Sequence, residues 1–172
     1  AAGAQTDPVL TECATPEPVV VPEALPEIQI GGSTLVATGA DAYRPVAVEV
    51  EGGYVVAGAT FSDTGRDILI ARLDGESGEV LGGAVVGGSG DDVARALAVS
   101  AKGEIVLAGH SDSRDLAPGQ RAAGGRDGFA LTLDAESLKV VAASFVATEG
   151  EDSVDALVTA ESGELLLAGT SN

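Results

Sequence analysis

From residue 28 onward the chain is a series of short apolar runs separated by glycine-containing turns. Val46, Val48 and Val50 alternate with Ala47 and Glu49, a period of two that is typical of a β-strand with one buried face. Residues 68–71 are apolar without interruption, as expected of a strand covered on both faces. Apolar residues do not recur at helical spacing over the length of a helix. The pattern therefore predicts an all-β chain.

The same short sequence motifs recur at fixed spacing. Residues 90–111 and 150–171 carry matching glycine, acidic and apolar residues sixty positions apart, without a gap. Residues 39–58 form an earlier copy, which matches residues 90–109 at a spacing of fifty-one. The difference of nine residues falls in one loop, between Gly109 and Gly125. Because matching registers with a single localised insertion rarely arise by chance, these repeats define the architecture.

Each full repeat is long enough for four strands of ordinary length. The predicted strands are 43–50, 53–59, 67–73 and 79–86 in the first repeat, 93–100, 104–110, 127–133 and 139–146 in the second, 153–159 and 164–169 in the third, and a solitary strand at 28–36. Four-stranded sheets repeated at this period are typical of β-propeller blades. We therefore expect β-propeller-like blades of four antiparallel strands, about two and a half of them. The repeat region is 27–172, with blade one at about 41–86, blade two at about 92–146 and a partial blade three at 152–172.

The repeated motifs also resemble those of a known group of repeats. Gly-x-Asp, Ala-Leu-Ala-Val-x-x-x-Gly-Glu-Ile-Val-Leu-Ala-Gly and Gly-Arg-Asp-Gly-Phe-Ala-Leu-x-Leu-Asp, spread over about 28–172, resemble the bacterial SBBP and delta-60 propeller repeats. The resemblance implies a propeller in a large secreted or cell-envelope protein, and it brings no catalytic motif. The chain departs from better-characterised propellers in lacking a WD dipeptide or Asp-box. Since propellers typically have four to eight blades, either a longer natural chain or other chains would close the ring.

Residues 1–26 differ from the repeats. They hold five of the seven prolines, interleaved with glutamates. Proline removes backbone donors and favours extended chain, so we expect an extended Pro-rich N-terminal arm or linker. Two interpretations stay open: a tether whose residues 19–21 lie along a partner, and a disordered leader. The opening residues 1–4 are small, which fits either a signal-peptide cleavage site or an internal fragment.

Cys13 lies in this arm and is the single cysteine of the chain. In an exported protein a lone cysteine is a candidate for an intermolecular disulfide, and an inert thiol is the alternative. One cysteine and one histidine exclude an internal disulfide framework and a self-contained Cys/His zinc site. We expect no metal and no cofactor.

Charge and hydropathy narrow the range of partners. The formal net charge is -18, which repels nucleic acid and acidic membrane surfaces. No stretch reaches the ~18 apolar residues of a membrane helix, so the chain is not expected to span a membrane. Aromatic residues make up 3% of the chain, which disfavours an aromatic-lined ligand groove. The hydrophobic share of 45% argues against wholesale disorder.

The inserted loop of the second repeat is the candidate recognition site. Inserted loops on a rigid scaffold often carry recognition, although an insertion there can also be merely tolerated. The candidate residues are Ser111, Asp112, Ser113, Arg114, Asp115 and Arg121.

Other repeated polar residues have structural explanations. Asp92 and Asp152 recur in a Gly-x-Asp corner, which turn hydrogen bonding explains better than calcium. Arg66 and Arg126 recur beside aspartates and are expected to form local or blade-to-blade ion pairs. His110 has no cysteine or second histidine near it in the sequence, and Ser111 beside it has no placed acid partner, so His110 is interpreted as a polar residue at a strand end. No catalytic residue is predicted.

These observations predict a non-enzymatic structural or protein-binding module of a secreted or cell-envelope assembly. Its location would be extracytoplasmic, and its partners would be other protein chains, the same or different, unless the natural chain is longer. Two alternatives stay open. The chain could be a fragment of a propeller enzyme, a hydrolase or lyase, whose catalytic residues lie elsewhere, or a carbohydrate-binding propeller.

Overall fold

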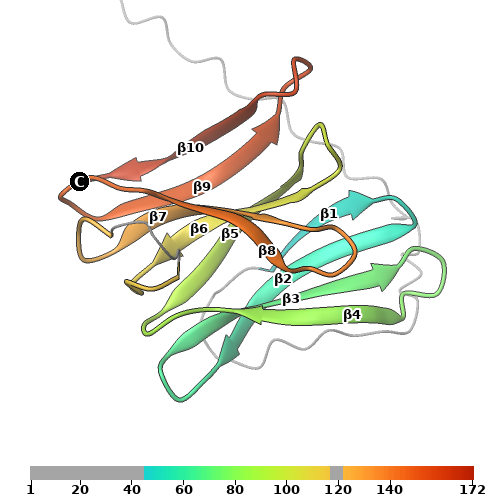
Figure 1. Cartoon of the computed structure of the whole chain (residues 1–172), viewed down its shortest axis with the longest axis horizontal. Helices are drawn as coiled ribbons and strands as arrows, with labels where there is room; N and C mark the ends of the chain where they lie inside the picture. Colours follow the sequence, from blue (N-terminus) through green and yellow to red (C-terminus); the bar gives the residue numbers. More distant parts are fainter. Residues whose placement is uncertain (1–44, 117–121) are drawn as a thin grey trace, which may run out of the picture. The chain divides into compact units, whose positions relative to one another are not determined.

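The computed structural model describes residues 45–116 and 122–172, which contain ten β-strands and no helix. The all-β prediction is confirmed (Figure 1). The strands are β1 (Val46–Val50), β2 (Gly53–Phe61), β3 (Arg66–Asp74), β4 (Val80–Val86), β5 (Asp92–Val99), β6 (Ile105–Ser111), β7 (Asp127–Leu133), β8 (Val140–Val146), β9 (Asp152–Thr159) and β10 (Leu165–Ser171). All ten lie where the repeats predict them, with their ends shifted by a few residues at most. The predicted strand at 28–36 and the arm 1–26 with Cys13 lie outside the described residues.

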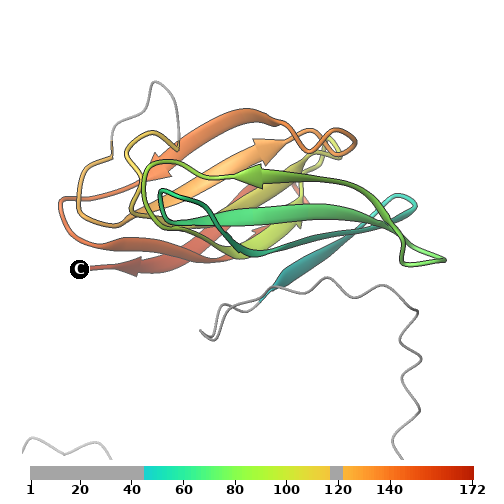
Figure 2. The same cartoon turned by 90° about the horizontal axis from the view of Figure 1, so that it is seen from below.

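The ten strands form three separate antiparallel sheets. Sheet A has the order β1-β2-β3-β4, sheet B has the order β5-β6-β7-β8, and sheet C pairs β9 with β10. Strands that follow each other in a sheet also follow each other in sequence, so their directions alternate (Figures 1 and 2). None of these sheets closes on itself. In the described ranges no helix could reach across a lipid bilayer.

Sheet B lies between sheets A and C (Figure 1). Strand β5 contacts β1, β2 and β3 of sheet A, and β9 contacts all four strands of sheet B. The first strands of the sheets therefore contact one another in succession, β1 with β5 and β5 with β9. The apolar core lies between sheets A and B. Its fully buried side chains include Ile68, Ile70, Leu107, Phe129 and Leu131.

The pairing of the first two strands has the same irregularity in sheets B and C. Between β5 and β6 the register passes over Arg95, and between β9 and β10 it passes over Asp155. At this bulge a methyl group on Gly109 would overlap the backbone oxygen of Val93, and one on Gly169 would overlap that of Ser153. The repeated glycine is therefore required by close backbone approach.

Candidate protein-interaction site

Among the described residues, strand β10 of sheet C pairs on one side only and has little cover. All but the first residue of β10 are exposed, whereas every residue of its counterpart in sheet B, β6, is buried. Leu107 is 0% exposed and Leu167, sixty positions later, is 42% exposed. Val106 is 2% exposed and Leu166 is 56% exposed. The same strand of the repeat is thus a core element in one sheet and a surface element in the next.

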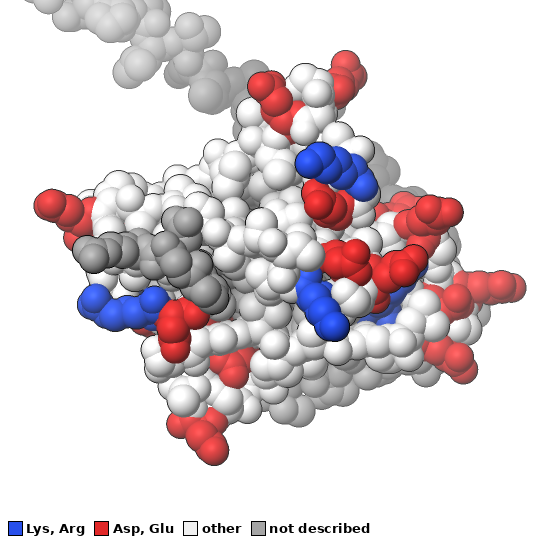
Figure 3. Space-filling model, in the orientation of Figure 1, with Lys and Arg blue, Asp and Glu red and all other residues white. Residues whose placement is uncertain are grey.

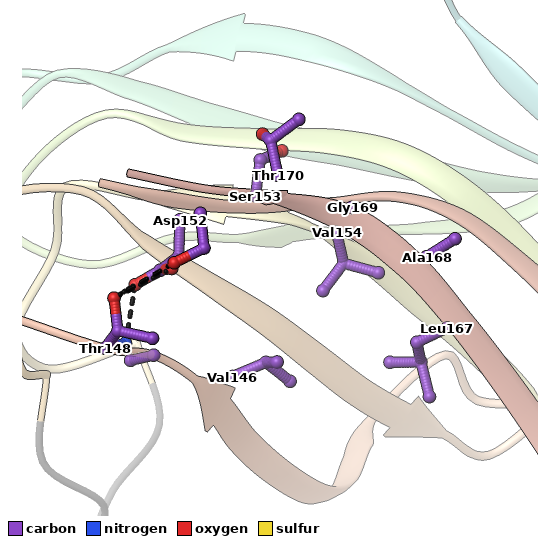
Figure 4. Close-up of a pocket in the computed structure, with 11 residues that line it drawn as sticks. Val146, Thr148, Asp152, Ser153, Val154, Leu167, Ala168, Gly169 and Thr170 are labelled. Carbon is purple, nitrogen blue, oxygen red and sulfur yellow. Dashed lines mark hydrogen bonds between the residues drawn. The ribbon is translucent and has the colours of Figure 1, made fainter. Parts of the chain in front are cut away.

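A groove lies between sheet C and the end of β8 (Figure 4). Its volume is about 270 Å³. Val154 of β9 and Leu167 of β10 point into it, and Val146 at the end of β8 lies across from them (Figure 4). The groove is therefore apolar along its length, and one of its ends is made by the polar pair Thr148 and Asp152.

The Thr148–Asp152 pair is one copy of a repeated turn. The Asp152 carboxylate accepts a hydrogen bond from the Thr148 backbone N–H at 2.6 Å, and the Asp92 carboxylate accepts one from the Gly88 backbone N–H at 2.8 Å. Each aspartate is the first residue of its strand. Its carboxylate binds the backbone N–H of the residue four positions earlier, in the connection that precedes the strand. The hydrogen bonds from the Thr148 backbone and the Ser171 hydroxyl hold the pKa of Asp152 below its usual value.

Asp92 is the more buried of the two aspartates, because sheet A and the inserted loop cover it. The Ser111 and Ser113 hydroxyls donate to its two carboxylate oxygens, the latter at 2.8 Å. Burial raises the pKa of Asp92, while hydrogen bonds from Ser111, Gly88 and Ser113 oppose the rise. The predicted role of these aspartates in turn hydrogen bonding matches this geometry. In residues 45–116 and 122–172 no group of three acidic, histidine or cysteine side chains is arranged to hold a metal ion.

The candidate recognition loop folds back on the connection between β4 and β5. Ser113 Oγ accepts a hydrogen bond from the Gly90 backbone N–H at 2.8 Å, and Asp115 accepts one from the Ser89 backbone N–H at 2.7 Å. The Ser89 backbone N–H holds the pKa of Asp115 below its usual value. Ser111 and Ser113 are therefore occupied in holding the loop, while Asp112 and Arg114 stand exposed. Arg121 lies outside the described residues.

The two repeated arginines both form ion pairs. Arg66 at the start of β3 lies 3.4 Å from Asp91, just before β5, so this pair joins sheets A and B. Arg126 lies 3.1 Å from Asp112 of the inserted loop. The predicted pairing is confirmed, although the two acidic partners are not equivalent in the repeat.

A second, polar pocket of about 280 Å³ is lined by residues of sheets B and C. The two bulge residues, Arg95 and Asp155, line it together with His110 and Arg126. Burial lowers the pKa of His110 to about 4, and the charges of Arg126 and Arg95 act in the same direction, against Asp112 and Asp155. His110 is therefore neutral at pH 7. The sequence does not predict this pocket, because Arg95 and Asp155 occupy one repeat position with opposite charges and the bulges appear only in the strand pairing.

The hydrogen bonding in this pocket defines what it can do. The Ser153 hydroxyl donates to Asp155 at 2.7 Å and lies 3.5 Å from His110 Nδ1. A hydroxyl has one proton, so this proton is directed to Asp155 and not to the imidazole. A serine nucleophile requires the opposite arrangement, with its hydroxyl donating to the base. The pocket thus offers charged and polar contacts beside the β9–β10 strand pair.

Charged side chains of both signs stand on the face of the molecule in Figure 3, and acidic ones are the more numerous. By contrast, β10 from Leu165 to Ser171 carries no charge. The outer strands of sheets A and B, β4 and β8, are likewise uncharged and largely exposed. Edge strands with such a composition are those that pair with other chains.

No protein-family model matches this chain, and no curated protein matches its sequence.

Proposed function

We propose that the chain is a non-enzymatic structural or protein-binding module of a secreted or cell-envelope assembly, built on β-propeller repeats and bound to other protein at sheet C. The observation that carries the proposal is the exposure of β10, whose counterpart β6 is wholly buried. Burying Leu166 and Leu167 to the same degree as Val106 and Leu107 would contribute about 25 cal/mol for each Å² removed from water. Covering this surface is therefore favourable.

The propeller part of the proposal rests on the order of the sheets. Successive four-stranded antiparallel sheets, each starting with a strand that contacts the first strand of the next, are what blades around a common axis require. The bulge and the capping aspartate recur in sheets B and C, which supports equivalent blades. The location outside the cytoplasm rests on the sequence alone, on its repeats and on the arm.

Native mass spectrometry of the full chain isolated from its natural host tests this proposal. We expect a complex heavier than the 16.9 kDa of the chain, and we expect slower hydrogen exchange of the β10 amides in the complex than in the separated chain. The denatured mass in the same experiment separates the two routes to a closed ring: a longer natural chain or additional chains. A stable 16.9 kDa monomer with rapidly exchanging β10 amides would contradict the proposal.

A further inference from the structure

Sheet B supplies an internal template for what covers β10. In sheet B, β6 pairs with β7 so that Ile105 lies opposite Leu133, Leu107 opposite Leu131 and Gly109 opposite Phe129. Sixty positions later, β10 presents Leu165, Leu167 and Gly169 at the equivalent places. A strand like β7, paired with β10, would therefore face apolar residues and a glycine at the same positions as β7 does when it pairs with β6.

The groove beside β10 has the size and lining for the aromatic side chain of such a strand. Phe129 is fully buried between sheets A and B, opposite a glycine. At the equivalent place in sheet C, Gly169 again has no side chain, and the groove of about 270 Å³ next to it is lined by Val146, Val154 and Leu167. An apolar cavity of about 150 Å³ is enough to bind benzene, so the groove has room for a phenyl ring.

The backbone and the charge of β10 favour the same occupant. Within the described residues β10 has one strand neighbour, β9, whereas β6 is paired on both sides. In the described part of the chain no strand pairs with its outer backbone groups, and its side chains carry neither charge nor proline, the usual protections of an edge. A strand from an acidic chain can approach it without like-charge repulsion from β10 itself.

We propose that the free edge of β10 and the adjoining groove accept a β-hairpin of the repeat's own third-and-fourth-strand type, on a partner chain, with an aromatic side chain equivalent to Phe129 entering the groove. This inference rests on the proposed function and names the class of partner. A second copy that paired its β10 with this β10 is a poorer occupant. Strand β10 has no aromatic residue, so the groove would stay unfilled.

The test uses the full chain and a synthetic peptide with the sequence of residues 125–146, which forms the β7–β8 hairpin in sheet B. Binding is measured by titration calorimetry and by hydrogen exchange of the β10 amides. We expect one peptide per chain and at least about tenfold slower exchange in β10 when the peptide is saturating. A peptide with Phe129→Ala should bind at least about tenfold more weakly, and a scrambled peptide should not bind.

Variants of the chain locate the binding surface. Leu167→Asp should abolish binding, because it places a carboxylate in the groove. Leu81→Asp is the matched control, since Leu81 is a 58% exposed leucine on β4, outside the groove, and it should bind the peptide as the unmodified chain does. Both positions are exposed, so both variants should fold, and the Phe129→Ala peptide tests the groove with the chain unmodified.

The remaining outcomes overturn the inference in distinguishable ways. Equal binding of the scrambled peptide would show an edge without a preferred hairpin, and a chain that dimerises through β10 would show a second copy as occupant. In both cases the inference fails and the proposed protein-binding function stands. If neither the peptide nor any chain in the host complex protects β10, the inference and the proposed function fail together.

Discussion

Asp92 at the start of β5 lies opposite Ser111 at the end of β6, and the Ser111 hydroxyl donates a hydrogen bond to its carboxylate. Sixty positions later, Asp152 lies opposite Ser171 in the same register. In sheets B and C the pair closes the open end of the first hairpin and ties it to the preceding connection through Gly88 or Thr148. The repeat thus preserves a polar cap as well as an apolar pattern.

Replacing the two aspartates should have unequal effects on stability. Asp92→Ala leaves the Ser111 and Ser113 hydroxyls and the Gly88 N–H without their acceptor in a buried setting, and should lower the free energy of unfolding by about 3 kcal/mol. Asp152→Ala leaves Thr148 and Ser171 without their acceptor, but both of these residues are exposed and can turn to water, so the loss should be about 1 kcal/mol. Urea denaturation of both variants measures the difference. Equal losses of unfolding free energy in the two variants would show that the burial of the hydrogen-bond partners does not determine the effect.

The strands, their order and the turn aspartates could be predicted from the sequence because they depend on local patterns. Alternation of apolar residues and glycine-containing turns define strands, and the sixty-residue spacing transfers each strand of one repeat to the next. The partners of Asp92 could not be predicted in this way. Ser113 reaches it from the inserted loop, which has no counterpart in the other repeats, so only the folded chain brings these side chains together.

His110 should make the stability of the fold depend on pH. Its folded-state pKa of about 4 lies below the ordinary value of 6.5, so folding favours the neutral imidazole. This stabilisation is fully present above pH 6.5 and is lost as the pH falls toward 4, by on the order of 3 kcal/mol. Arg126, Arg95, Asp112 and Asp155 are the charged groups around it.

Denaturation curves of the unmodified chain and of His110→Gln, taken at several pH values, check this effect. The carboxylates titrate in both proteins, so the difference between the two curves isolates the histidine. We expect the difference to change between pH 6.5 and 4 and to be constant above pH 7. A difference that does not vary with pH would mean that His110 is as easily protonated in the folded chain as in the unfolded one.

The bulge between the first two strands should be intolerant of a side chain. Gly109→Ala places a methyl group against the Val93 backbone oxygen, which must shift a buried strand, and should cost about 2 to 3 kcal/mol. Gly82→Ala is the matched control, because a methyl group there meets nothing within 4 Å, and should change stability by less than about 0.5 kcal/mol. Thermal unfolding of the two variants compares them. A neutral Gly109→Ala would show that the bulge can relax.

The polar pocket shows why the sequence could not define the whole candidate site. Arg95 and Asp155 occupy one repeat position but carry opposite charges, so neither conforms to a motif. Their meeting depends on the packing of β9 against sheet B and on the bulge that turns both residues out of the ladder. The exposure of β10 is also a tertiary property, since its residues are as apolar as those of β6.

Equivalent leucines in β6 and β10 should differ in their contribution to stability. Leu107→Ala empties a fully buried site in the core between sheets A and B and should cost about 2 to 5 kcal/mol. Leu167→Ala removes a side chain that is 42% exposed, and should cost less than about 1 kcal/mol in the isolated chain. Guanidinium denaturation at two protein concentrations measures both. A large, concentration-dependent loss for Leu167→Ala would mean that copies of the chain already cover sheet C, and a large loss independent of concentration would mean that β10 is covered within a single chain.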